Sequence, residues 1–314
     1  MRLEDIKIVA CVGAGVIGHS WACVFAQRGF MVRLMDINAD VLNEIPEKVR
    51  ANYEVFIKKG LMTYNELEDT LKRIKIGLDI SWAVESADFC IESVGEDLSL
   101  KKDVYIQMDK FAPKRSILAS STSGQSITEI SQVTGRPEKC IIMHPLNPPH
   151  IIPAVEVVRG ESTSEETTNL TIELLKKIGR KPFVCMKEVP GFVLTRFMTI
   201  ILREALSLLN RGVASVEDID TAINAGLGLR FGLMGIFEIN NLTTTGGLEA
   251  FFKRYGDSIR YIWADIEELK EIPPALAEKA VAGIKAELGN RSPEDMIRWR
   301  DEKLLDLMRI RNLI

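Results

Sequence analysis

The chain has 314 residues, of which 46% are hydrophobic and 27% charged, the balance of a globular protein of about two domains. Its net charge of -4 gives no basic surface for nucleic acid. The five cysteines form no C-x-x-C pair, which argues against a structural zinc site and favours a reducing, cytoplasmic compartment.

The first half of the chain alternates strand-like and helix-like segments. The N-terminus runs at once into a β-branched segment, so we expect no signal peptide there. Alternating strands and helices favour parallel pairing with right-handed crossovers. The predicted fold is therefore α/β, with a Rossmann-type doubly wound parallel sheet. The expected strands are 6–12, 31–36, 87–94, 116–122 and 139–144, and the expected helices are 19–28, 51–75 and 99–112.

The pattern of expected elements changes near residue 188. A long apolar segment, 191–210, follows Pro190 and precedes Gly212. Charged side chains interrupt it, so it is expected to be a buried helix and not a membrane span. No clear strand follows. The sequence thus predicts a nucleotide-binding domain over 1–188 and an all-α domain over 189–314, whose apolar helices bury the interface of a homodimer.

A glycine-rich motif lies between the first expected strand and helix. Gly13 permits a tight turn, Gly15 lets the backbone approach a pyrophosphate, and Gly18 allows close helix–strand packing. Asp36 ends the second strand, where a carboxylate accepts hydrogen bonds from ribose hydroxyls and repels a 2′-phosphate. The pattern predicts NAD rather than NADP; the alternative is a structural turn with a surface aspartate. The candidate cofactor-binding residues of this motif are Gly13, Gly15, Val16, Ile17, Gly18 and Asp36.

The segment HPLNPPHIIPAVEVV, residues 144–158, contains four prolines, which exclude a helix and a central strand. A neutral His144 could take the proton of an alcohol, and Glu156 could fix its tautomer and stabilise the imidazolium. The alternative is a packed loop histidine beside an unrelated glutamate. His150 competes for the role of base, but it has no acid nearby in the sequence.

These motifs together resemble the 3-hydroxyacyl-CoA dehydrogenase family over nearly the whole chain. The likeness is carried by VGAGVIG at 12–18, IESVGEDLSLKK at 91–102, SSTSG at 120–124, HPLNPP at 144–149, VEVV at 155–158 and PGFVLTR at 190–196. The resemblance implies that His144 is the general base and Glu156 its orienting partner. It also implies that Ser123 and Asn147 hydrogen-bond the reacting oxygen or steady the loop.

Two further implications rest on the resemblance alone. Glu96 and Lys101 would contact the nicotinamide half of NAD, although composition by itself would make them a solvated helix start. Thr195 stands where the family has an asparagine in the catalytic site. Its hydroxyl can still donate or accept a hydrogen bond, so the departure bears on the substrate more than on the reaction class.

Within the family, the sequence is most similar to the λ-crystallin branch, which includes an L-gulonate 3-dehydrogenase. GLGLRFGLMG at 226–235 places Arg230 where it would grip a free carboxylate through two parallel hydrogen bonds; the alternative is a helix-end ion pair. The expected activity is NAD-dependent oxidation of a small, L-gulonate-like 3-hydroxy acid. A short-chain 3-hydroxyacyl-CoA dehydrogenase and a non-catalytic, crystallin-like NAD-binding protein are the alternatives.

Overall fold

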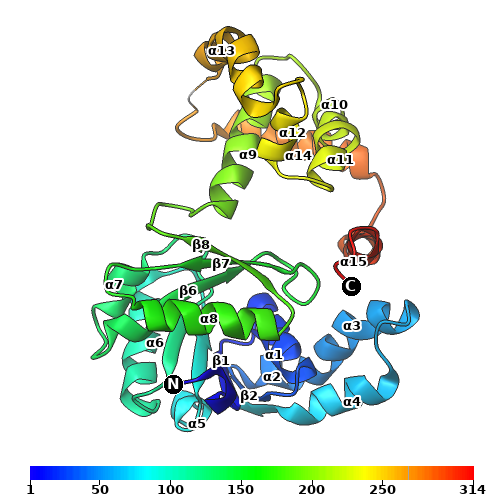
Figure 1. Ribbon diagram of the computed structural model, residues 1–314. Helices are drawn as coiled ribbons and strands as arrows, with labels where there is room; N and C mark the ends of the chain where they lie inside the picture. Colours follow the sequence, from blue (N-terminus) through cyan, green and yellow to red (C-terminus); the bar gives the residue numbers. More distant parts are fainter. Residues whose placement is uncertain (268) are drawn as a thin grey trace. The chain divides into compact units, whose positions relative to one another are not determined.

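The computed structural model describes residues 1–267 and 269–314, which form two compact units, Met1–Arg196 and Phe197–Ile314 (Figure 1). The division predicted after residue 188 falls on the segment that connects the last strand to the long helix α9 (Leu194–Asn210). Each unit contains its own cluster of packed apolar side chains.

The first unit is built on one eight-stranded sheet with the order β3-β2-β1-β4-β5-β6-β7-β8. The pairs from β3 to β6 are parallel, which confirms the Rossmann-type doubly wound sheet. The strands are β1 (Ile8–Val12), β2 (Met31–Met35), β3 (Ile74–Gly77), β4 (Phe89–Glu92), β5 (Ile117–Ser120), β6 (Cys140–Pro145), β7 (Ala154–Val158) and β8 (Lys181–Cys185).

The pair β6/β7 is antiparallel, whereas the sequence predicted only parallel pairing. The proline-rich loop between them reverses the chain, and β8 then pairs parallel to β7. The expectation that residues 144–158 contain no central strand is wrong at both ends of the segment. Pro145 ends β6, and β7 lies inside the sheet, because the other three prolines fall outside β7.

The helix expected over 51–75 is also wrong as a single element. Helix α3 ends at Lys58, and a second helix begins at Tyr64. The break has a local cause, because the Thr63 side chain accepts a hydrogen bond from the Glu66 N–H and the Glu66 carboxylate accepts one from the Thr63 N–H. The last residues of the expected helix form the edge strand β3 instead.

Helices lie on both faces of this sheet (Figure 1). One apolar cluster lies between the sheet and helices α5, α6 and α7, and Tyr105 and Met108 of α6 are completely buried in it. The helical segments of the unit are η1 (Leu3–Asp5), α1 (Val16–Gln27), α2 (Ala39–Asn43), α3 (Ile45–Lys58), α4 (Tyr64–Arg73), α5 (Ile80–Val84), α6 (Leu98–Phe111), α7 (Ile127–Ser131), η2 (Pro137–Lys139) and α8 (Glu165–Lys177).

All secondary-structure elements among the described residues of the second unit are helical. A capping box of Ser215 and Asp218 begins α10, and Leu206, Leu209 and Leu276 form a small core. No described helix is both long and apolar enough to cross a membrane. The segments after α9 are α10 (Val216–Thr221), the π-helical η3 (Ala222–Leu227), α11 (Gly228–Phe231), α12 (Ile236–Asn241), α13 (Gly247–Asp265), α14 (Pro274–Leu288) and α15 (Pro293–Ile310).

Helix α9 differs from its prediction in two ways. It begins at Leu194 and not at 191, because Gly191 and Phe192 adopt left-handed backbone angles of φ 75° and 48°. It is also not a buried helix within this single chain. Its N-terminal half exposes apolar side chains: Phe197, Met198, Ile200, Ile201 and Leu202 are 43–61% exposed.

Candidate active site

The carboxyl ends of the parallel strands β1, β4, β5 and β6 meet at one edge of the sheet, the edge where ligands bind in such folds. Because side chains alternate between faces along a strand, Glu92, Ser120 and His144 share the face that packs against α5, α6 and α7. All three are buried at the ends of their strands. The sheet thus gathers polar groups from distant segments at one edge.

The glycine turn between β1 and α1 is shaped by what surrounds it. A Cβ on Gly13, where φ is 97°, would lie 2.6 Å from the Ser93 carbonyl oxygen, and one on Gly18 would lie 1.8 Å from the Gly13 carbonyl oxygen. Both positions therefore exclude any side chain. A Cβ on Gly15 would meet nothing within 4 Å. The open space at Gly15 fits the close approach of a pyrophosphate that the motif requires.

The other residues of the motif lie around this turn. Val16 and Ile17 form the first turn of α1, and the Val16 side chain is 61% exposed. The N–H groups of a helix N-terminus bind phosphate through hydrogen bonds and the helix dipole. The Asp36 carboxylate accepts hydrogen bonds from the N–H groups of Ala14 at 2.8 Å and Asn38 at 3.0 Å. Asp36 therefore ties the end of β2 to the glycine turn.

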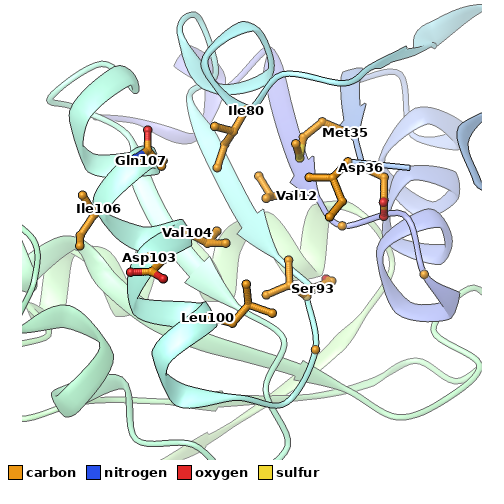
Figure 2. Close-up of a pocket in the computed structure, with 15 residues that line it drawn as sticks. Val12, Met35, Asp36, Ile80, Ser93, Leu100, Asp103, Val104, Ile106 and Gln107 are labelled. Carbon is orange, nitrogen blue, oxygen red and sulfur yellow. The ribbon is translucent and has the colours of Figure 1, made fainter. Parts of the chain in front are cut away.

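A cavity of about 570 Å³ opens beside Asp36 and the glycine turn. Figure 2 shows Val12 and Met35 from the sheet and Leu100 and Val104 from α6 around it. The lining is mainly apolar, as suits an adenine ring. Among the described residues that line it, none is a lysine or arginine. The residues present therefore fit a dinucleotide without a 2′-phosphate.

His144 and Glu156 are brought together by the antiparallel pair β6/β7, in which they are direct partners. The His144 Nδ1 lies 2.8 Å from Glu156 Oε2. The glutamate is fully buried and the histidine is 8% exposed. Since Nδ1 faces the carboxylate, Nε2 is the ring nitrogen that can exchange a proton with a substrate.

The second carboxylate oxygen, Glu156 Oε1, accepts hydrogen bonds from the N–H groups of Val193 at 2.6 Å and Leu194 at 3.0 Å and from the Cys185 thiol at 3.5 Å. Burial raises the pKa of Glu156, but the hydrogen bonds from His144, Leu194 and Val193 outweigh it and hold the pKa below its usual value. The carboxylate is thus kept ionised. These donors were not predicted from the sequence; the only sequence feature that points to them is the Pro-Gly-Phe turn directly before the helical segment.

Ser123, Glu96 and Lys101 belong to one network. The Glu96 carboxylate accepts hydrogen bonds from the Ser123 N–H at 3.1 Å and hydroxyl at 3.4 Å, and also from the Thr122 hydroxyl. Lys101 Nζ contacts Glu96 at 3.2 Å and Glu92 at 2.9 Å.

Lys101 and Glu92 are both almost fully buried, which differs from the solvated helix start that composition suggested. Glu92, which was not among the predicted site residues, accepts a further hydrogen bond from the Ser120 hydroxyl at 2.6 Å. The sequence feature that could have identified Glu92 is an acidic residue inside an apolar strand. The network joins β4, β5 and α6 beneath Ser123.

Thr195, Asn147 and His150 are the remaining candidate residues of the first unit. The Thr195 hydroxyl donates to the Ser123 carbonyl at 3.3 Å, so these two residues are neighbours. Asn147 is exposed in the loop after β6. His150 is buried, with its ring 6.4 Å from those of Tyr53 and Phe56 on α3 and its Nδ1 3.5 Å from the Ser20 hydroxyl.

Arg230 lies in the second unit, is exposed, and donates to the Ile239 carbonyl at 3.4 Å. The contact between Arg230 and a substrate carboxylate stays a prediction. Within residues 1–267 and 269–314, no group of three or more His, Cys, Asp or Glu side chains is arranged to hold a metal ion.

Comparison with known proteins gives a consistent result. Residues 8–189 match the model of the 3-hydroxyacyl-CoA dehydrogenase NAD binding domain, and residues 191–281 match that of the C-terminal domain. The chain is 34% identical to the lambda-crystallin homolog of Homo sapiens, over 98% of this chain and 97% of the relative. It is also 34% identical to an L-carnitine dehydrogenase of Bacillus cereus, over 99% and 94%.

Among solved structures, one similar protein is 5-formyl-3-hydroxy-2-methylpyridine 4-carboxylic acid 5-dehydrogenase, described as an NAD+-dependent dismutase. The TM-score is 0.83 and the identity 31%, and the alignment covers 98% of each chain. The likeness therefore extends over both units.

Proposed function

Because this chain belongs to the 3-hydroxyacyl-CoA dehydrogenase family and is an NAD-dependent oxidoreductase of that family, we propose that it oxidises the 3-hydroxyl group of a small, free 3-hydroxy acid. The single observation that carries the proposal is the buried contact between His144 and Glu156. A histidine oriented by a buried carboxylate is a suitable general base for an alcohol.

The chemistry assigned to the chain's own residues is a proton transfer. His144 Nε2 accepts the proton of the substrate hydroxyl as the carbinol carbon becomes a ketone, and Glu156 stabilises the imidazolium that forms. Bound NAD supplies the acceptor for the hydride that leaves the same carbon. Ser123 and Asn147, and the Thr195 hydroxyl beside the Ser123 carbonyl, are proposed to steady the reacting oxygen and its loop.

The cofactor is assigned to the glycine turn and the cavity beside it. Gly13, Gly15 and Gly18 shape the turn, Val16 and Ile17 begin the helix that follows, and Asp36 would accept the ribose hydroxyls. Glu96 is the group of the Glu96–Lys101 pair proposed to reach the nicotinamide half, since it is half exposed. Lys101, which is 1% exposed, would act by holding Glu96.

The free carboxylate is supported by the names of the relatives. L-carnitine is itself a 3-hydroxy acid with a free carboxylate, and the solved relative is named for a pyridine carboxylic acid. Arg230 is our candidate for gripping this group. L-gulonate and L-carnitine are therefore the first substrates to test.

A second candidate, a short-chain 3-hydroxyacyl-CoA, is favoured by the family description and by the 30% identity over 88% of the chain to the structure of a 3-hydroxybutyryl-CoA dehydrogenase of Escherichia coli. A non-catalytic, crystallin-like role is disfavoured by the ordered His144–Glu156 contact. A homodimer formed through the second unit and a reducing compartment remain proposals; all five cysteines are free and buried.

One screen separates these candidates. NADH formation is followed with L-gulonate, L-carnitine, 3-hydroxybutyrate and 3-hydroxybutyryl-CoA, using His144→Gln as the matched inactive control. We expect the highest kcat/KM with a free acid. A preference for the CoA ester would transfer the assignment to the second candidate, and no turnover with any of the four would contradict both.

A further inference from the structure

The Glu156 carboxylate is held at both of its oxygens. Oε2 faces His144 Nδ1 at 2.8 Å, and Oε1 accepts from the N–H groups of Val193 at 2.6 Å and Leu194 at 3.0 Å. The side chain is fully buried, so protein groups and not solvent set its orientation. The two N–H donors on Oε1, together with the Cys185 thiol, therefore decide which way Oε2 points.

Both donors are aimed by the turn that precedes them. Gly191 and Phe192 have φ angles of 75° and 48°, in the left-handed region that a residue with a Cβ rarely adopts. This turn brings the chain from Val189 into α9 with the N–H groups of Val193 and Leu194 facing β7. Glycine suits such a conformation, but phenylalanine has to be held in it.

Phe192 is held by its own contacts. Its side chain is 1% exposed, and its ring centroid lies 6.2 Å from that of His144 at an interplanar angle of 60°. Its N–H donates to the Val189 carbonyl at 2.9 Å. The same residue thus touches the imidazole directly and aims the donors that fix the imidazole's partner.

We propose that Phe192 is a positioning residue of the His144–Glu156 pair. Its left-handed backbone directs two N–H groups at Glu156 Oε1, and this fixes Oε2 on His144 Nδ1. The inference rests on the proposed function of the pair as a general base and its partner. Phe192 contributes through its ring, which packs near His144, and through its backbone conformation. The backbone conformation contributes more, because it orients both N–H donors.

A matched pair of substitutions isolates the backbone effect. Leucine and isoleucine have the same volume and hydrophobicity, but β-branched isoleucine is far less compatible with a positive φ. We expect Phe192→Ile to lose about 100-fold in kcat, the loss that a small misplacement of a catalytic group can cause. Phe192→Leu should lose markedly less, and KM for NAD should not move in either variant.

The same substitutions in a Glu156→Gln background show whether Phe192 acts through Glu156. If it does, the isoleucine change should cost little more once the carboxylate is gone, so the two losses will not multiply. Equal fold losses in both backgrounds would mean that Phe192 affects activity by another route, and the proposal would be wrong.

A second readout needs no substrate, so it separates this inference from the proposed reaction. The chain has three histidines, and NMR of the ring nitrogens shows which nitrogen of His144 carries the proton. A carboxylate facing Nδ1 fixes the tautomer with the proton on that nitrogen. We expect Phe192→Ile to populate the other tautomer, as Glu156→Ala does, and Phe192→Leu to do so less. An unchanged tautomer in the isoleucine variant overturns the proposal.

If the isoleucine variant does not fold, amide hydrogen exchange decides the question. The N–H groups of Val193 and Leu194 should exchange slowly in the wild type and much faster in Glu156→Ala. The Phe192 N–H, which donates to Val189, serves as the internal reference. Equal exchange rates of Val193 and Leu194 in both proteins would show that Glu156 does not hold this turn.

Discussion

His144 and Glu156 are opposite one another in the register of β6 and β7, and their side chains meet at 2.8 Å between Nδ1 and Oε2. The twelve-residue spacing is therefore the spacing of two antiparallel strands and the loop between them. A cross-strand pair has its Cβ atoms close together by construction. The geometry of the pair is a property of the sheet, and the prolines of the loop serve to reverse the chain.

This relationship predicts the effect of removing the base. His144→Ala should lower kcat roughly 10²–10⁴-fold, the usual contribution of a positioned acid–base group. NAD affinity should persist, because the cavity beside Asp36 does not include His144. Steady-state kinetics and NAD titration test both parts. His150→Gln is the control, since His150 packs against Tyr53 and Phe56; a larger loss in the control would reverse the assignment.

Asp36 should set the preference for NAD over NADP. A carboxylate at this position accepts ribose hydroxyls and repels a 2′-phosphate, and no cation lines the described part of the cavity. We expect Asp36→Asn to narrow the ratio of kcat/KM for NAD to that for NADP, mainly by removing the repulsion. Asp36→Ala should also weaken NAD itself, because the tether to the Ala14 N–H is lost. Equal wild-type turnover with both cofactors would contradict this role.

The pKa of Glu156 predicts how stability depends on pH. Its folded-state pKa lies below the usual value despite burial, because of hydrogen bonds from His144, Leu194 and Val193. The folded state thus binds this proton more weakly than the unfolded chain does. The stabilisation is fully present above the ordinary glutamate pKa of about 4.3 and is lost as pH falls through the lowered folded-state value.

Urea unfolding of the wild type and Glu156→Gln, at several pH values from about 3 to 7, measures this effect. The free energy of unfolding of the wild type should fall more steeply with acidification than that of the glutamine variant. Parallel curves would show that Glu156 does not change its proton affinity on folding.

Arg230 should recognise the carboxylate of the substrate. We expect Arg230→Met to raise KM for a free 3-hydroxy acid roughly 10- to 100-fold, the cost of removing a charged hydrogen-bond partner. NAD affinity should not change. Arg298→Met is a suitable control, since Arg298 pairs with Asp295 within α15. If KM for every free acid stays the same in the Arg230 variant, the carboxylate is bound elsewhere or the substrate is a CoA ester.

The second unit should form a homodimer. It has a core of few residues, and its long helices expose large apolar side chains, among them Ile262 and Trp263 of α13. Exposed apolar surface of this extent usually marks an interaction surface. Light scattering at micromolar concentration should give twice the mass of 35.2 kDa. A mass equal to one chain would contradict the prediction.

The sequence by itself determined the fold class and the cofactor. The cofactor motif has a fixed sequence spacing relative to a strand and a helix, and the sequence shows this spacing directly. Its residues are Gly13, Gly15, Gly18 and Asp36. The alternation of apolar strands with helices likewise predicted the parallel sheet. It did not reveal β3, because four residues after a charged helix carry too short a pattern to be separated from it.

Only the tertiary structure decided how the site is assembled. The sequence proposed His144 and Glu156 as a pair through family likeness, and their contact depends on the reversal of β7 against β6. The donors to Glu156 Oε1 come from Cys185, Val193 and Leu194, far along the chain. Local spacing cannot record such contacts, because the packing of distant segments selects which strand lies beside which and at what register.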